Sequence, residues 1–236
     1  MGLEDGLLSD EGGFEFSDQD IRKSFIRKVY GILCAQLLLT IGIMSIFTFS
    51  EGVKKYAFEN SWPFWVAFAV TFVIIIVLSC CPDTRRTSPI NIILLGIFTV
   101  CEGVLLGMAC ATFDTTTVLI AVGITAALVL ALTLFAFQTK VDFTVCNGIM
   151  FVALICLIIF GLFAIIFQSK VLDILYASLG ALVFGIYIVI DTQLMMGGSH
   201  KYSLSPEEYI FAALNLYLDI INLFLYVLML VNSARN

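Results

Sequence analysis

Two aspartates interrupt the last two long apolar stretches of the chain, and they are the residues best placed for chemistry. Asp191 lies in the stretch Ile174–Met196, and Asp219 lies near the middle of Tyr209–Val231. Each stretch is long enough to cross a bilayer as an α-helix, for which about 20 residues suffice. An acid at such depth is costly and therefore indicates a function. We expect the two acids to face each other inside a helical bundle.

The expected pairing suggests how the two acids would work. Two carboxyl groups in one site of low dielectric cannot easily both be ionised, so the pair should titrate as a unit. When ionised, it would attract a hard cation such as Ca²⁺, which takes oxygen ligands. We therefore predict that Asp191 and Asp219 form a pH-sensing, gating pair that binds calcium transiently. The alternative is a packing role, in which each acid is protonated and hydrogen-bonded; Asn215 and Asn222, one turn from Asp219, would then support it.

Three other charged residues are candidates for a role beside this pair. Glu102 is the other acid deep within an apolar stretch, and we expect it nearer the middle of the membrane, on a possible ion pathway. Arg85 and Arg86 follow the second apolar stretch, at the end of the bundle expected to hold the aspartates. An arginine paired with an ionised carboxylate would form a charge-assisted latch. Protonation or calcium would compete with that latch and bias the bundle between closed and open states.

The elements that must position these residues are seven apolar stretches separated by short gaps. Hydrophobic residues make up 61% of the 236 positions and charged residues 13%, against roughly 45–50% and 25% in soluble domains. We predict an all-α membrane protein, a seven-transmembrane helical bundle in one domain (25–236), preceded by an acidic, flexible cytosolic tail (1–24). The predicted spans are Val29–Phe49, Trp62–Cys81, Ile90–Met108, Val118–Phe137, Phe143–Phe167, Ile174–Met196 and Tyr209–Val231.

The basic residues of the gaps predict the orientation of this bundle. Eight lie on the side of the N-terminus and four on the other side, so the positive-inside rule places the N-terminus in the cytosol. Both aspartates then fall in the cytosolic half of the membrane. The eight are Arg22, Lys23, Arg27, Lys28, Arg85, Arg86, Lys140 and Lys201, and the four are Lys54, Lys55, Lys170 and Arg235.

Ser199 and His200 come nearest to a hydrolytic site. They are adjacent in one gap, and His200 is the only histidine of the chain, whereas a nucleophile and its base normally converge from separate elements. No set of His, Cys and Glu residues has the spacing of zinc ligands, and no basic patch suggests a nucleic acid. We therefore predict no enzymatic activity, no cofactor and no nucleic-acid partner, with calcium as a permeant or regulatory ion.

Two local patterns concern packing and helix ends. Gly103 and Gly107 form a GxxxG pair, which lets two helices approach closely; we favour a contact inside a monomer over a dimer face. The run Ser205-Pro206-Glu207-Glu208 has the pattern of a capping box before the last span, in which the glutamate side chain bonds back to the backbone of the serine.

The last span carries a resemblance to a known family. The run 205–209 (SPEEY), followed by 212–214 (AAL) and 216–224 (LYLDIINLF), resembles the signature of the transmembrane Bax inhibitor motif family. Three further runs, 27–30 (RKVY), 138–143 (QTKVDF) and 191–193 (DTQ), resemble its lifeguard branch, also called glutamate-receptor-associated proteins. The similarity covers roughly residues 20–232.

This resemblance implies a seven-helix fold with a central last helix and a pH-sensitive calcium leak across internal membranes. The family pairs the acid of the last-span motif with the acid ending the sixth span, which correspond to Asp219 and Asp191 here. The family's arginine after the second span matches Arg85 best, with Arg86 as the alternative. Glu102 matches a position that is acidic in some relatives. Members restrain cell death and lower stored calcium in the endoplasmic reticulum, Golgi, endolysosomes or plasma membrane.

Together, these observations predict a cytoprotective calcium leak channel gated by Asp191 and Asp219. Its expected partners are calcium ions, membrane lipid, and apoptosis regulators or other calcium channels, and it is expected to be a monomer. Two alternatives stay open at this point. One is a membrane scaffold that regulates other channels or death regulators without conducting ions, and the other is a proton/calcium exchanger.

Overall fold

The computed structural model describes the fold of residues 4–198 and 200–235, with side chains from Asp20 onward. This part of the chain is helical without strands, and seven of its helices are long and apolar enough to cross a membrane. The predicted all-α, seven-span bundle is thus confirmed. The elements in order are α1 (Glu4–Phe49), α2 (Glu51–Glu59), α3 (Trp62–Cys80), α4 (Pro82–Arg86), α5 (Ile90–Cys110), α6 (Thr115–Gln138), η1 (Phe143–Cys146), α7 (Asn147–Phe167), α8 (Lys170–Met196), η2 (Pro206–Glu208) and α9 (Tyr209–Arg235).

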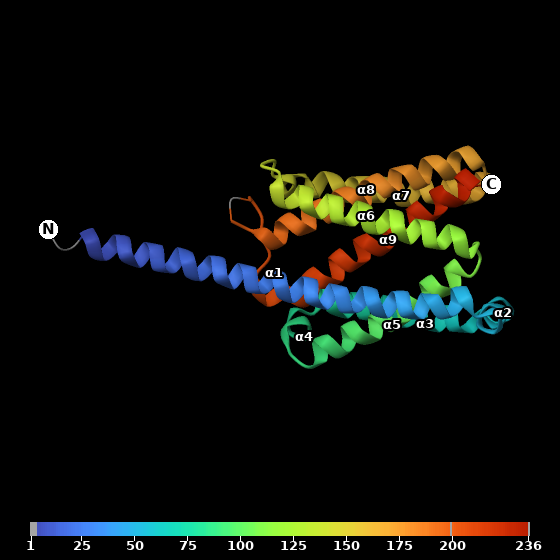
Figure 1. Cartoon of the computed structure of the whole chain (residues 1–236), viewed down its shortest axis with the longest axis horizontal. Coiled ribbons are helices and arrows are strands. Elements are labelled where there is room, and N and C mark those ends of the chain that lie inside the picture. Colours follow the sequence, from blue (N-terminus) through green and yellow to red (C-terminus); the bar gives the residue numbers. More distant parts are fainter. Residues whose placement is uncertain (1–3, 199, 236) are drawn as a thin grey trace.

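The first helix extends well beyond the predicted first span. α1 begins at Glu4, and its N-terminal part projects away from the other helices (Figure 1). Residues 4–24, which we expected to be part of a flexible tail, therefore belong to this helix. Residues 1–3 and the side chains before Asp20 lie outside the described part. The membrane-spanning part of α1 is Asp20–Phe49.

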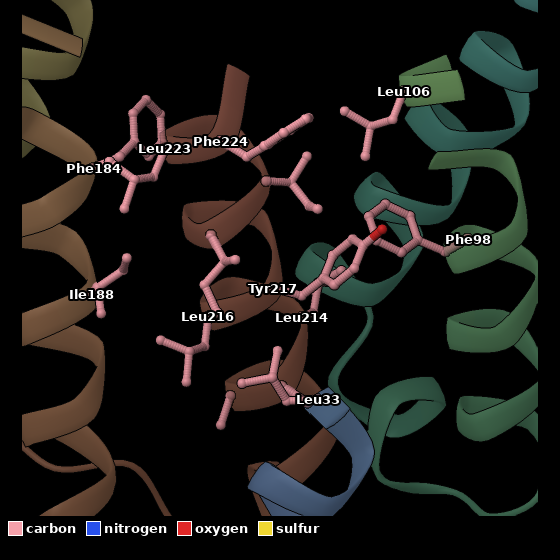
Figure 2. Packing of buried hydrophobic residues seen from close by; sticks show 14 of the residues in the cluster. Leu33, Phe98, Leu106, Phe184, Ile188, Leu214, Leu216, Tyr217, Leu223 and Phe224 are labelled. Atoms are coloured by element: carbon pink, nitrogen blue, oxygen red, sulfur yellow. The ribbon is translucent and has the colours of Figure 1, made fainter. Parts of the chain in front are cut away.

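The last helix occupies the centre of the bundle. α9 crosses between a layer formed by α6, α7 and α8 and a layer formed by α1, α3 and α5 (Figure 1). In its most apolar 18-residue window 56% of the residues are buried, against 17% for the corresponding window of α6. Tyr217 is fully buried in the first half of α9, and its ring meets Phe98 edge to face, with centroids 5.8 Å apart (Figure 2). The central last helix implied by the resemblance is observed.

Glycines bring neighbouring helices into close contact at defined points. A Cβ atom on Gly107 would clash with the Phe47 ring, and one on Gly103 would lie 2.9 Å from Cδ1 and 3.1 Å from Cβ of Ile43. Such distances leave no room for a side chain, so the GxxxG pair packs α5 against α1 within the monomer, as we favoured from the sequence. This close approach is how helices associate where lipid supplies no hydrophobic drive between them.

Neutral hydrogen bonds join the same helices in the interior. The Gln36 amide on α1 donates to the Thr99 hydroxyl on α5 at 3.0 Å, and the Thr40 hydroxyl lies 2.7 Å from the Tyr217 hydroxyl on α9. All four side chains are buried. Because each polar group would otherwise lie unpaired in an apolar environment, these bonds specify how α1 sits against α5 and α9.

Candidate functional site

The two predicted aspartates meet between α8 and α9. Asp219 is 7% exposed, Asp191 is partly buried, and their carboxyl groups interact directly with each other. α8 and α9 pack along one another more extensively than any other pair of described helices. Since the gap that joins them is short, the two helices run antiparallel, and residues near the end of one meet residues in the first half of the other. This places the two acids at one level of the bundle.

No ion pair neutralises the two aspartates within the described part of the chain. Tyr187, one turn before Asp191 on α8, lies near enough to interact electrostatically with both carboxyl groups. The sequence offered no signal for this tyrosine beyond its spacing of one turn from Asp191. Two acids that face each other without a cation are sensitive to protons, because a shared proton removes the repulsion between them.

The other residues proposed to assist the pair lie elsewhere or have their own contacts. Glu102 on α5 is partly buried and interacts with Tyr217 of α9. The Asn222 amide donates to the Leu218 carbonyl of its own helix at 2.8 Å, and Asn215 is partly buried one turn before Asp219. The roles of Glu102, Asn215 and Asn222 therefore stay predictions.

The structure gives Arg85 and Arg86 a partner other than the expected one. Arg85 Nε lies 2.5 Å from Oε2 of Glu208, and Arg86 Nε donates to Oε1 of the same carboxylate at 2.7 Å. Glu208 is 4% exposed and precedes Asp219 by eleven positions, roughly 16 Å along a helix. The physical reason is placement: α4 and η2 lie at the same end of the bundle, so the arginines meet the carboxylate at the start of α9 rather than the paired aspartates deeper along it.

Aromatic and amide groups hold this Arg85–Arg86–Glu208 cluster in place. The Asn91 amide donates to the Arg85 carbonyl at 2.9 Å and to the Tyr209 hydroxyl at 3.2 Å. The Arg85 guanidinium lies 4.7 Å from the centroid of the Phe211 ring, and Nζ of Lys28 lies 3.3 Å from that of Tyr209. Cations over aromatic faces are attracted by the ring quadrupole. The cluster thus joins α1, α4, α5 and α9 at one end of the bundle.

Glu208 is the residue that the sequence pattern misassigned. The capping box is only half formed: the Ser205 hydroxyl accepts a bond from the Glu207 backbone N–H at 3.5 Å, whereas the Glu208 carboxylate binds the two arginines. An acid next to an apolar span, together with adjacent arginines at the same predicted end, is the signal that could have indicated this ion pair.

A second polar cluster joins the α6–α7 connection to the α8–α9 connection. Asp142 accepts bonds from the Thr144 hydroxyl at 2.6 Å and from the Lys201 backbone N–H at 2.8 Å. Nδ1 of His200 lies 3.5 Å from the same carboxylate. These bonds, with that of Thr144 foremost, lower the pKa of Asp142. His200 therefore lies beside Asp142, while Ser199 lies outside the described residues.

Two buried or half-buried side chains complete this end of the bundle. The Gln193 amide, fully buried on α8, donates to the Val141 carbonyl at 2.9 Å and accepts from the Phe143 N–H at 2.8 Å. Arg22 of α1 donates to the Leu204 carbonyl at 2.6 Å. Both connections are thus tied to helices, and α1 is tied to the connection that leads into α9.

The sequence predicted that Asp191 and Asp219 bind calcium transiently. No three His, Cys, Asp or Glu side chains gather as a metal site in the part of the chain with described side chains. Ca²⁺ takes six to eight oxygen ligands in stable sites, and Asp191 and Asp219 together offer four carboxylate oxygens. Transient binding of calcium by this pair therefore stays a prediction.

Comparison with known proteins gives matches over nearly the whole chain. The family model described as "Inhibitor of apoptosis-promoting Bax1" matches residues 22–236. The chain is 43% identical over 237 residues to "Protein lifeguard 3" of Homo sapiens, covering 98% of the chain and 76% of the relative. It is also 43% identical over 223 residues to the Mus musculus protein of that name, covering 93% and 72%. It is 39% identical over 215 residues to the "Golgi anti-apoptotic protein" of Vaccinia virus (strain Lister), covering 91% and 87%.

Proposed function

Because the chain belongs to the family of inhibitors of apoptosis-promoting Bax1, we propose that it restrains cell death by acting as a calcium leak in an intracellular membrane. The leak lowers stored calcium and responds to pH through the pair Asp191–Asp219. The name of the viral relative, "Golgi anti-apoptotic protein", supports both the restraint of cell death and a Golgi membrane as a site of action. Calcium is the permeant ion and membrane lipid the constant partner.

The observation that carries the proposal is the contact between two acids inside a membrane-spanning bundle. Asp219 is buried and its carboxyl group interacts with that of Asp191. An ionisable group at such a position is costly and marks an ion or proton pathway by default. A pair of carboxylates supplies oxygen ligands for a hard cation and changes its charge as protons bind.

The position of the pair links protonation to helix packing. Asp191 and Asp219 lie on α8 and α9, the two most extensively packed helices. When both acids are ionised they repel each other across this interface, and when one is protonated they attract each other through a hydrogen bond. A change of protonation therefore alters the free energy of the α8–α9 contact, which is the kind of local charge change that shifts a two-state element.

The test is calcium flux into proteoliposomes that contain only this protein, measured at several pH values between 6 and 8. We expect flux that varies with pH in the wild-type protein and loses this variation in Asp191→Asn and Asp219→Asn. Asp173→Asn is the matched control, since Asp173 lies in the first turn of α8, away from the pair, and should leave the pH profile unchanged.

The same preparation separates the proposal from its alternatives. Uphill calcium movement driven by an imposed proton gradient would replace the leak with an exchanger. No flux from folded, inserted protein would overturn the conducting function and favour a scaffold that regulates other channels or death regulators. Equal pH profiles in wild type and both aspartate variants would remove the gating role of the pair.

A further inference from the structure

A pocket of about 240 Å³ lies between four membrane-spanning helices, α1, α5, α6 and α9. Its floor is formed by Ile220, Ile221 and Phe224 of α9, and its walls come from α1, α5 and α6. Phe224 and Leu106, two of the lining residues, are seen in Figure 2. α1 and α6 each pack extensively on α9, but they make little contact with each other. The pocket therefore lies where the ring of helices around α9 is open.

The pocket opens on the side of the bundle, between α1 and α6. Ile41 on α1 is 42% exposed and Leu130 on α6 is 66% exposed, and both line the pocket. They lie well inside the spans Asp20–Phe49 and Thr115–Gln138 respectively, so the opening is at the depth of the hydrocarbon core rather than of the aqueous phase. Lipid is therefore the molecule that reaches this opening directly.

The chemistry of the lining favours a hydrocarbon ligand. No charged residue lines the pocket, and its polar side chains are Thr40 and Thr125. The Thr40 hydroxyl is engaged with the Tyr217 hydroxyl at 2.7 Å, and Thr125, 5% exposed, has a hydroxyl without a hydrogen-bond partner among the described residues. A dry cavity of about 150 Å³ lined by Leu, Ile and Phe already takes up benzene. This larger pocket holds a run of several methylene groups, and a hydrated ion or a headgroup would lose its hydrogen bonds there.

We propose that this pocket binds one acyl chain of a bilayer lipid, which enters between α1 and α6 and lies against α9. Ile220 and Ile221 directly follow Asp219, and at 3.6 residues per turn Ile221 lies on nearly the opposite face of α9 from Asp219. The bound chain therefore contacts α9 at the level of the aspartate pair but from the other side. This goes beyond the proposed function and does not depend on calcium conduction. It identifies a contact through which lipid composition acts on the central helix.

The test is photolabelling of the full chain in liposomes that contain phosphatidylcholine with a diazirine in the middle of one acyl chain. Lipid around any membrane protein labels the exposed surface, so the informative sites are those on the buried floor. Ile220, Ile221 and Phe224 are 6%, 7% and 6% exposed and are reached through the pocket. We expect label on these residues, located by mass spectrometry of the peptides. Label confined to exposed residues of the outer helices would overturn the proposal.

Two adjacent alanines of α6 provide a matched pair of variants. Both are exposed, but Ala126 lines the pocket and Ala127 does not. Ala126→Phe fills the pocket and should lower labelling of the floor by about fivefold or more, because even a small loss of free energy of lipid binding changes occupancy by that factor. Ala127→Phe should leave the labelling unchanged. Unchanged labelling in Ala126→Phe, or an equal loss in both variants, would contradict lateral entry here. Val129→Phe, also in the lining, repeats the test if Ala126→Phe does not fold.

A third variant tests the chemistry of the ligand. Thr125→Val keeps the shape of the side chain and removes its hydroxyl, to which a hydrocarbon chain makes no hydrogen bond. Labelling of the floor should therefore be the same as in the wild-type protein. Loss of labelling would overturn the assignment to an acyl chain, because it would show that the ligand carries a polar atom at this depth.

Discussion

Glu208 at the end of η2 and Asp219 on α9 are both buried acids, but their neighbours carry charges of opposite sign. Glu208 is 4% exposed and binds Arg85 and Arg86. Asp219 is 7% exposed and faces a second acid, Asp191, with no ion pair in the described part of the chain. Burial is nearly equal, so burial alone does not distinguish a structural acid from a responsive one. The sign of the neighbouring charge does.

The difference follows from position along the last helix. Glu208 directly precedes α9, where α4 presents two guanidinium groups from the connection between the spans Trp62–Cys80 and Ile90–Cys110. Asp219 lies about three turns further in, among apolar helices, where a cation would be costly to bring. An acid fixed by two arginines holds its charge, whereas two acids that share a site change their charge together.

The largest effect is expected for Glu208→Gln. The substitution replaces the carboxylate, which binds both guanidinium groups, with a neutral amide. Hydrogen bonds to charged groups contribute roughly 1.5–3 kcal/mol each. We expect the free energy of unfolding, measured by SDS titration in mixed micelles, to fall by about 2–3 kcal/mol. Glu207→Gln is the control, because Glu207 is 73% exposed and 3.8 Å from Arg86; it should change stability by less than about 0.5 kcal/mol. Equal effects of both variants would mean that the cluster is not a structural tie.

A smaller effect is expected for Thr40→Val, which leaves the buried Tyr217 hydroxyl without its partner at 2.7 Å. An unsatisfied buried hydroxyl costs roughly 1–3 kcal/mol, and we expect a loss of about 1–2 kcal/mol in the same assay. The double variant Thr40→Val/Tyr217→Phe removes both partners and should cost less than the sum of the two single variants. Strict additivity would show that the bond does not stabilise the α1–α9 contact.

Asp219→Asn should have a smaller effect still on stability, although we expect it to abolish the pH dependence of the proposed calcium flux. The variant removes one of two like charges, and its amide can donate to the Asp191 carboxylate. We expect the free energy of unfolding at neutral pH to stay within about 1 kcal/mol of the wild-type value. A loss as large as that expected for Glu208→Gln would break the comparison, since it would mean that Asp219 is also held as a fixed structural charge.

The smallest effect concerns Asp142, an acid outside the spans. Its pKa is lowered, chiefly by the bond from the Thr144 hydroxyl and then by that from the Lys201 backbone N–H. A lowered pKa in the folded state means that the stabilisation is present above the unfolded pKa, about 3.9, and is lost as the pH falls through the folded pKa. Hydrogen exchange at the Thr144 and Lys201 amides should therefore be faster in Asp142→Asn than in wild type at pH 6. Equal exchange in the two proteins would show that the carboxylate does not anchor this connection.

Hydropathy alone was sufficient for the spans, because each must cross the same thickness of hydrocarbon. The predicted Trp62–Cys81 corresponds to α3, Trp62–Cys80, and the predicted Ile90–Met108 to α5, Ile90–Cys110. The first span was the exception in extent: α1 begins at Glu4, well before the predicted Val29. Apolar length marks where a helix lies in the membrane and carries no information on how far it continues in water.

The candidate site was predicted in part. An acid within an apolar stretch is visible in the sequence, so Asp191 and Asp219 could be identified, and the short gap between their helices brought them to one level. The partner of Arg85 and Arg86 could not be identified, because Glu208 also fits the pattern of a capping box and the choice depends on where α4 folds back. Tyr187 was not singled out, because only its spacing of one turn from Asp191 pointed to it. Asp142 occurs in the run 138–143 of the resemblance, but its bond from the Lys201 backbone N–H could not be predicted, because the two residues lie 59 positions apart.

The sequence by itself determined the class of this protein: seven helices that cross a membrane, two acids within them, and membership of a family through the motif of the last span. The tertiary structure alone decided which charges meet, that Glu208 is neutralised while Asp219 faces another acid, and that α1 and α6 leave an apolar pocket against α9. The physical reason is range. Hydrophobicity and helix length are properties of local segments, whereas ion pairs and cavities depend on the relative placement of helices that the local sequence does not encode.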